Sequence, residues 1–278
     1  MTAPLFHAPR ELLAGASTVL LDGPEGRHAA LVRRLQAGEA LVLTDGRGLV
    51  AHCVVLRTVG QALDLEVREL LEEPAPSPRL TVVQALAKGD RGETAVETMT
   101  EIGVDVIVPW SASRSITQWK GERGAKSLEK WRGTAREAAK QSRRAWWPEV
   151  TEPASTARVA KLLAAATLPI VLHEEAALGL ADVAPPRRSD ELTDAGSSSG
   201  SDRASDGGSV GLPRRPSDPA VAEIVLVVGP EGGISPEELA QFAEAGAEPY
   251  RMGPTVLRTS TAGTAAAAVL LARSGRWA

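Results

Sequence analysis

The stretch EIVLVVGPEGGISPEEL at residues 223–239 decides the fold class of this chain. After Glu223 its first residues are continuously apolar and mostly β-branched, as expected for a strand buried on both faces of a parallel sheet. The glycines and the proline that follow cannot continue a strand. Ser235 then offers an N-cap, Pro236 suits the first helical position, and Glu238 completes a capping box. A strand, a glycine-rich turn and a capped helix predict an α/β unit that binds a ligand at the carboxyl end of the strand.

A second loop follows closely and strengthens the prediction of a ligand site. EPYRM at residues 248–252 is expected to form a short strand, and the apolar run at 261–271 predicts a helix with Thr261 as its N-cap. A single glycine-rich turn can simply connect a strand to a helix without binding a ligand. Two such loops close together favour a ligand-binding site. The chain has neither a Walker motif nor a GxGxxG turn that opens a βαβ unit, so a nucleoside triphosphate or dinucleotide is not expected.

The rest of the chain divides into an N-terminal β-rich part and a larger α/β part. Short β-like runs separated by turn signals predict a small antiparallel barrel within residues 1–73. A proline-rich linker follows, and beyond it strands alternate with helices, which implies a mostly parallel sheet. The expected strands lie at 19–21, 39–43, 49–56 and 62–67 in the barrel, and at 80–86, 104–108, 168–172, 223–228 and 248–252 beyond it.

Residues 185–219 are rich in Ser, Gly, Asp and Pro and contain almost no large apolar side chain. Such a segment cannot bury enough apolar surface to order itself. We predict a disordered surface insertion between two strands, without a catalytic role.

Composition narrows the class of protein further. The 278 residues suffice for two domains, and the single cysteine, Cys53, excludes a disulfide framework and a multi-cysteine metal site. No metal site is expected, because no histidine has ligand spacing to Cys53. The first residues lack the features of a secretory signal, and no apolar run is long enough for a membrane span, so a cytoplasmic protein without a membrane partner is expected.

The formal net charge of −4 argues against a uniformly basic nucleic-acid binder, but residues 111–150 contain ten Lys or Arg, four Glu and four Trp. Cations neutralise phosphates and indoles stack on unpaired bases, so this segment predicts an RNA-binding face with Trp146 and Trp147 among its candidates. The alternative is an amphipathic helix with a solvated basic face. Apolar residues recur there at helical spacing, so Trp131 is expected in the core.

The two loops, GPEGGISPEEL at 229–239 and MGPTVLRTSTAG at 252–263, resemble the ribosomal RNA small subunit methyltransferase E family of the SPOUT superfamily. The resemblance covers nearly the whole chain, since KGDR at 88–91, EIGVDVIVP at 101–109, EAAKQS at 137–142 and VRRLQAG at 32–38 follow in the family's order. It implies an α/β protein with a PUA-like β-barrel at 1–73, a linker at 74–79, and a SPOUT domain at 80–278 that ends in a trefoil knot. Such a knot is an exception to the usual unthreaded topology.

The resemblance further implies methyl transfer from S-adenosylmethionine to N3 of a uridine in the 16S rRNA of the small ribosomal subunit, by a homodimer. The helix at 261–272 is the expected contributor to the dimer interface, unless it is buried in its own subunit. The residues expected to bind the cofactor are Leu172, His173, Gly229, Pro230, Glu231, Gly232, Gly233, Met252, Gly253, Pro254, Val256 and Leu257. The residues expected to contact RNA are His28, Arg34, Arg91, Arg114, Arg143 and Arg144.

Catalysis of this reaction is expected to come mainly from positioning the methyl group in line with N3. The N3 proton must leave, which requires a base or a cation that stabilises the uracil anion. Arg258 is the candidate for this cation, or for holding phosphate, and a structural clamp is the alternative. The general base is left unassigned. Ser260 stands where the family commonly has Glu, so a role of that carboxylate does not transfer to this chain.

Two other functions stay open at this point. A related enzyme of the same superfamily would methylate another rRNA or tRNA position, because cofactor loops read the methyl donor and not the acceptor. A protein of a different class would be a non-catalytic RNA-binding ribosome assembly factor that retains the cofactor pocket without using it.

Overall fold

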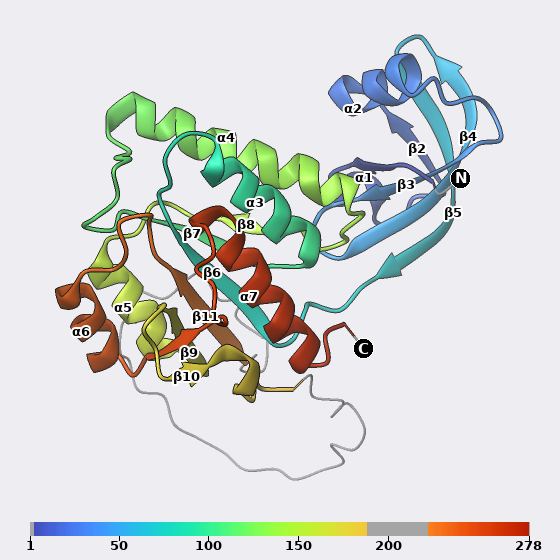
Figure 1. The fold of residues 1–278 in the computed structure, drawn as a ribbon. Helices are drawn as coiled ribbons and strands as arrows, with labels where there is room; N and C mark the ends of the chain where they lie inside the picture. The colour runs from blue at the N-terminus through green and yellow to red at the C-terminus, as the bar shows by residue number, and fades with distance from the viewer. Residues whose placement is uncertain (1–2, 188–221, 278) are drawn as a thin grey trace, which may run out of the picture. The chain divides into compact units, whose positions relative to one another are not determined.

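The computed structural model describes residues 3–187 and 222–277. All but the first three residues of the insertion predicted at 185–219 therefore lie outside the described residues. The chain forms two compact units, each described by itself below (Figure 1). The first contains Met1–Pro76, Glu93–Val106 and Lys120–Val150, and the second contains Ser77–Gly92, Ile107–Trp119 and Thr151–Ala278. No helix of the described residues is long and apolar enough to cross a membrane.

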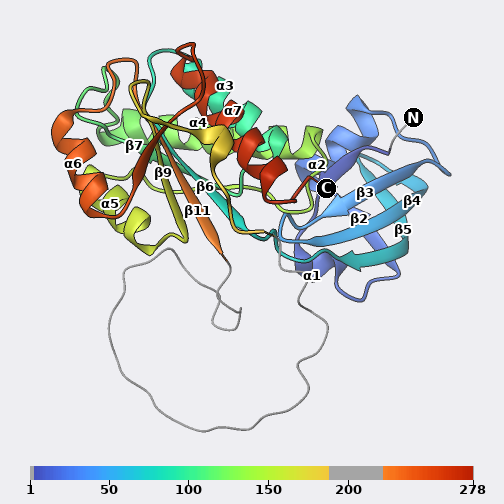
Figure 2. The ribbon, with the colours of Figure 1, turned by 60° about the horizontal axis from the view of Figure 1, so that its bottom comes forward.

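The first unit is built on a curved five-stranded sheet with the order β1-β3-β4-β5-β2 (Figure 2). Its four longer strands confirm the runs predicted from sequence, and they pair antiparallel. The three-residue strand β1 was not predicted, because three residues show no alternation, and it pairs parallel to β3. The strands are β1 (Leu5–His7), β2 (Thr18–Leu21), β3 (Ala40–Thr44), β4 (Leu49–Val59) and β5 (Ala62–Glu72).

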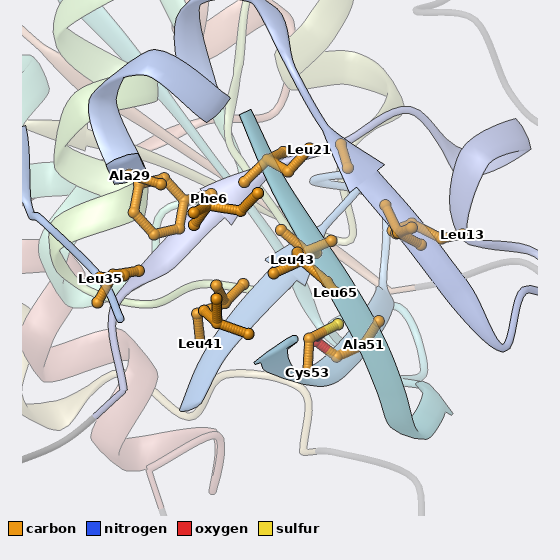
Figure 3. Close-up of a cluster of buried hydrophobic side chains, with 14 of the residues drawn as sticks. Phe6, Leu13, Leu21, Ala29, Leu35, Leu41, Leu43, Ala51, Cys53 and Leu65 are labelled. Atoms are coloured by element: carbon orange, nitrogen blue, oxygen red, sulfur yellow. Dashed lines mark hydrogen bonds between the residues drawn. The ribbon is translucent and has the colours of Figure 1, made fainter. Parts of the chain in front are cut away.

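Alternate residues of these strands point to one side of the sheet and form an apolar core (Figure 3). In β2, for example, Val19 and Leu21 are buried, whereas Thr18 and Leu20 are exposed. Phe6 and Leu43 are buried in the same cluster. Cys53 also lies there, and burial raises the pKa of its thiol to about 11, so this cysteine is a core residue and not a nucleophile.

The long basic helix α4 (Gly121–Gln141) belongs to the first unit and buries one face. Leu128, Trp131, Ala135 and Ala138 are all buried on it, which confirms that Trp131 is a core residue. The remaining elements that lie wholly within this unit are short: α1 (Arg10–Leu13), α2 (Gly23–Arg27), the π-helical turn η1 (His28–Val32) and β8 (Glu149–Val150). Helix α3 (Arg91–Ile102) contributes all but its first two residues.

Two tryptophans after α4 hold the turn between β3 and β4. The backbone N–H of Trp147 donates to the Gly46 carbonyl at 2.9 Å, and the indole Nε1 of Trp146 donates to the Glu73 carbonyl at 3.1 Å. Gly48 has φ +98°, and a Cβ atom there would lie 2.6 Å from the Glu73 carbonyl oxygen. The indole Nε1 of Trp147 also donates to the Arg144 carbonyl at 3.0 Å, so both indoles have a structural role in the first unit.

Replacing Gly48 by alanine is expected to lower the free energy of unfolding of this unit by about 2 to 4 kcal/mol, because the new Cβ combines left-handed backbone strain with overpacking. Urea unfolding followed by tryptophan fluorescence measures the loss. The matched control is Gly60→Ala, which has φ +62° but no heavy atom within 4 Å of the new Cβ, and it is expected to lose only about 1 kcal/mol. Equal losses in the two variants would show that the contact with Glu73 contributes nothing.

The second unit contains the strands β10-β12-β9-β11-β6-β7, which follow one another in this order in a seven-stranded sheet. The pairs from β10 to β6 are all parallel, which confirms the predicted α/β class. Strands β9 and β11 have the bounds that were predicted. The strands are β6 (Arg79–Ala85), β7 (Val106–Trp110), β9 (Leu168–Leu172), β10 (Leu178–Gly179), β11 (Glu223–Val228) and β12 (Glu248–Arg251).

Helices cover both faces of this sheet. Helix α7 (Thr259–Arg273) packs against β6 and β11, whereas α5 (Thr156–Ala165) packs against β9 and against α6 (Pro236–Glu244). Figures 1 and 2 show α7 on one face and α5 and α6 on the other. The 3-10 turn η2 (Leu180–Asp182) also contacts α7. The trefoil knot implied by the resemblance stays a prediction.

Of the two N-cap predictions beside the loops, one is confirmed and one is wrong. The capping box of Ser235 and Glu238 at the start of α6 is confirmed. The prediction of Thr261 as the N-cap of α7 is wrong, because the backbone N–H groups of Thr261 and Ala262 both donate to the Arg258 carbonyl. The helix therefore begins at Thr259 with Arg258 as its N-cap, and the Thr261 hydroxyl donates back to the same carbonyl at 3.1 Å.

Candidate functional site

Three loops meet at the carboxyl ends of β12, β9 and β11, which are neighbours in the sheet. The backbone N–H of His173, after β9, donates to the Tyr250 carbonyl of β12 at 3.0 Å. Thr259 follows the loop after β12, and its hydroxyl donates to the carbonyl of Gly229, in the loop after β11, at 3.2 Å. The structure thus brings together all three segments in which cofactor-binding residues were predicted.

The glycine-rich loop after β11 favours glycine at two of its positions, Gly229 and Gly233. At Gly229 a Cβ atom would lie 2.8 Å from Cγ1 of Ile234, so a larger residue displaces that side chain. Gly233 has φ +71° while its N–H donates to the Pro230 carbonyl at 2.9 Å. Main chain without side chains is therefore exposed along this turn, and a ligand can approach it closely.

Glu231, at the tip of this loop, has protein partners. Its carboxylate accepts from the backbone N–H of Lys88 at 3.3 Å and from Nη1 of Arg91 at 3.0 Å. Burial disfavours the charged carboxylate, but hydrogen bonds from its own backbone, from Arg91 and from Lys88 outweigh burial, and the pKa of Glu231 is lowered. Glu231 and Arg91 were predicted to bind the cofactor and RNA respectively; the structure pairs them with each other, and both roles stay predictions.

The loop between β12 and α7 exposes both apolar side chains and backbone groups. The exposed fraction is 79% for Val256 and 37% for Leu257. Within the part of the chain that the structure describes, the backbone groups of residues 253–257 make no hydrogen bond to another residue. Apolar surface beside free backbone donors and acceptors suits a ligand with an aromatic ring and polar edges.

Two arginines adjoin these loops. Arg114 is exposed, and its Nη1 atom lies 3.4 Å from the Gly232 carbonyl. Arg258 is exposed at the start of α7, and its side chain bonds to no other described residue. Both cations are therefore available to an anionic or electron-rich ligand beside the glycine-rich loop.

Sequence reasoning missed the buried contacts by which two polar residues, Glu238 and Gln84, support the site. Glu238 is 5% exposed, and its carboxylate accepts from the hydroxyls of Ser113 and Thr156 and from the backbone N–H groups of Ser113 and Ser235. Gln84 is fully buried at the end of β6 and donates to the Thr259 carbonyl at 3.4 Å. The signal for Gln84 was a long polar residue in a mostly apolar strand. The capping box indicated Ser235 as a partner of Glu238, whereas nothing local indicated Ser113 or Thr156.

The four RNA-contact candidates of the first unit differ in their surroundings. Arg34 and Arg143 are exposed, with positive φ values of 55° and 57°. His28 packs edge-on against Phe6 with ring centroids 5.7 Å apart. The side chain of Arg144 is only 11% exposed, and it donates to the carbonyls of Thr100 and Val104 and pairs with Asp105. Arg144 thus caps the end of α3, and Arg34 and Arg143 carry the solvent-facing charge.

Family models match both parts of the chain. The model described as RNA methyltransferase domain matches residues 73–198 and 206–271, and the model described as RNA methyltransferase PUA domain matches residues 21–66. With the curved N-terminal sheet and the loops of the parallel sheet, these matches define an RNA methyltransferase with a PUA-like domain.

Curated relatives specify the family. Ribosomal RNA small subunit methyltransferase E of Mycobacterium bovis is 41% identical over 281 residues, which cover 100% of this chain and 94% of that protein. The Bacillus subtilis protein of the same name is 25% identical, with 91% and 89% covered. The chain belongs to the ribosomal RNA small subunit methyltransferase E family, which confirms the resemblance seen in the sequence.

Solved structures support the same fold. A methyltransferase of Legionella pneumophila in complex with bound S-adenosylmethionine is 25% identical with a TM-score of 0.76, and 98% of each chain is covered. Ribosomal RNA small subunit methyltransferase E of Neisseria gonorrhoeae, bound to S-adenosylmethionine, is 24% identical with a TM-score of 0.74 and the same coverage. In the described part of this chain, no group of three His, Cys, Asp or Glu side chains is placed to hold a metal ion.

Proposed function

We propose that this protein transfers the methyl group of S-adenosylmethionine to N3 of a uridine in the 16S rRNA of the small ribosomal subunit. Membership of the family supports methylation of rRNA, and the two similar structures with bound S-adenosylmethionine support the cofactor. The observation that carries the proposal is the meeting of three ligand loops beside an arginine, Arg258, whose side chain is free among the described residues.

The residues of the three loops fit this cofactor. Free backbone groups at 253–257 would bind the polar edge of the adenine, and the exposed side chains of Val256 and Leu257 would cover its ring. The glycine-rich loop would approach the methionine part, with Gly229, Pro230, Gly232 and Gly233 giving access to main chain. Leu172, His173, Met252, Gly253 and Pro254 would complete the pocket. When bound, the cofactor supplies an electrophilic methyl group on a sulfonium.

The negative charge that forms on the acceptor uracil needs stabilisation, and residues of this chain can provide it. N3 of uracil becomes nucleophilic when its proton leaves, and the negative charge then spreads onto the two carbonyl oxygens. We assign Arg258 to this charge, because a guanidinium that is not already paired can donate two N–H groups to such oxygens. Arg114, beside Gly232, would hold a phosphate of the acceptor strand. The general base stays unassigned.

The first unit would supply the wider RNA contact. We propose a PUA-like RNA-binding domain at residues 1–73, joined by 74–79 to a SPOUT domain at 80–278, with Arg34 and Arg143 on phosphates. We further propose that the enzyme acts in the cytoplasm as a homodimer to which α7 contributes. Sedimentation equilibrium of the full chain tests the oligomeric state.

Transfer of labelled methyl from S-adenosylmethionine to small ribosomal subunits that lack the modification tests the function. Nuclease digestion and mass spectrometry identify the product, and 3-methyluridine is the expected nucleoside. A different methylated nucleoside would keep the class of enzyme and reject this acceptor. Absence of transfer by folded protein that binds the cofactor would favour the assembly-factor alternative.

A further inference from the structure

The ion pair between Arg91 and Glu231 joins two loops at the same edge of the sheet. One loop follows β6 and the other follows β11, and the two strands are parallel neighbours with Gln84 opposite Val228. The paired residues are 140 positions apart in the chain. The N–H of Lys88 donates to the same carboxylate oxygen of Glu231, so the pair belongs to a small network.

Glu231 is the only residue between Gly229 and Gly233 whose side chain can reach across to another segment, because its neighbours are glycines and a proline. The loop after β6 is itself anchored, since the hydroxyl of Thr117 donates to the Ala87 carbonyl at 2.9 Å. The pair therefore connects a glycine-rich loop to an anchored segment. Restricting such a loop in its binding conformation reduces the entropy lost when a ligand binds.

We infer that Arg91 is a positioning residue, which acts through Glu231 to hold the glycine-rich loop in the conformation that binds S-adenosylmethionine. The inference rests on the proposed function. Arg91 thus supports methyl transfer without touching RNA, in contrast to the contact expected from the sequence. Because only Nη1 contacts the carboxylate, the role needs a cation at one end and an anion at the other, not an arginine at position 91 as such.

Isothermal titration calorimetry of the full chain with S-adenosylmethionine tests the inference. Arg91→Gln and Glu231→Gln are each expected to weaken binding about fivefold, as suits a partly exposed ion pair. Arg91→Lys keeps a cation at position 91 and leaves the Glu231 carboxylate to accept from Lys88, so it is expected to return the Kd to within about twofold of wild type. In methyl-transfer assays, KM for the cofactor should rise in the single variants while kcat at saturating cofactor stays within about twofold.

The matched control is Arg57→Gln. Arg57 pairs with Asp64 at the same distance of 3.0 Å and is also partly exposed, but both residues lie in β4 and β5 of the other unit. Loss of the ion pair between Arg57 and Asp64 should leave the affinity for S-adenosylmethionine unchanged. Wild-type affinity in Arg91→Gln would overturn the inference, as would an Arg91→Lys variant as weak as Arg91→Gln despite an unchanged melting temperature. Failure of the wild-type protein itself to bind the cofactor would instead reject the proposed function.

Discussion

Replacing Arg258 by alanine is expected to lower kcat for methyl transfer about 100-fold or more and to change the Kd of S-adenosylmethionine by less than about twofold. The reason is that the guanidinium is assigned to charge that develops on the uracil and not to the cofactor. The fold should survive, because the N-cap role of Arg258 uses its backbone carbonyl, which accepts from Thr261 and Ala262 whatever the side chain. Single-turnover transfer at saturating cofactor measures the effect.

Two further variants make this result specific. Arg258→Lys keeps the positive charge but loses the planar pair of donors, so its rate is expected to lie between those of wild type and alanine. Lys161→Ala removes an exposed cation from α5 of the same unit and should leave the rate unchanged. If Arg258→Ala instead melts at a much lower temperature and loses cofactor affinity in parallel with rate, Arg258 is a structural clamp between the loops.

Sequence patterns predicted the structural features that depend only on residues close together in the chain. The apolar run of β11 and the capping box of α6 are such features, because each is complete within about six residues. The N-cap of α7 was misassigned for a related reason. Thr261 has the better side chain for capping, but the backbone bonds to the Arg258 carbonyl place the N-cap three residues earlier.

Features made by distant contacts were not accessible from the sequence. Arg144 and Trp146 looked like RNA-binding residues because the pattern around them is basic and aromatic, yet Arg144 bonds to Val104, 40 residues away, and Trp146 to Glu73, 73 residues away. The loops of the site were predicted correctly as a group, since the carboxyl ends of parallel strands share one edge. The pairing of Glu231 with Arg91 needed the strand order, which places β11 beside β6.

Replacing Gly233 by alanine is expected to weaken S-adenosylmethionine binding about tenfold to 100-fold, with a loss of only about 1 kcal/mol in the free energy of unfolding. The new Cβ meets no close neighbour, since the nearest atom is Nη1 of Arg114 at 4.0 Å. The cost therefore comes from φ +71°, which alanine avoids by moving the loop away from the shape that exposes its main chain. Calorimetric titration and urea unfolding measure the two effects.

Gly246→Ala separates backbone strain from a specific loss of the ligand site. Gly246 has a similar φ of +84°, also has no heavy atom within 4 Å of a new Cβ, and follows the end of α6, outside the three loops. The two variants should lose similar stability, and only Gly233→Ala should lose cofactor affinity. Equal affinity in both would mean that the glycine-rich turn does not approach the cofactor, and the ligand would then have to be held by the loops after β9 and β12 alone.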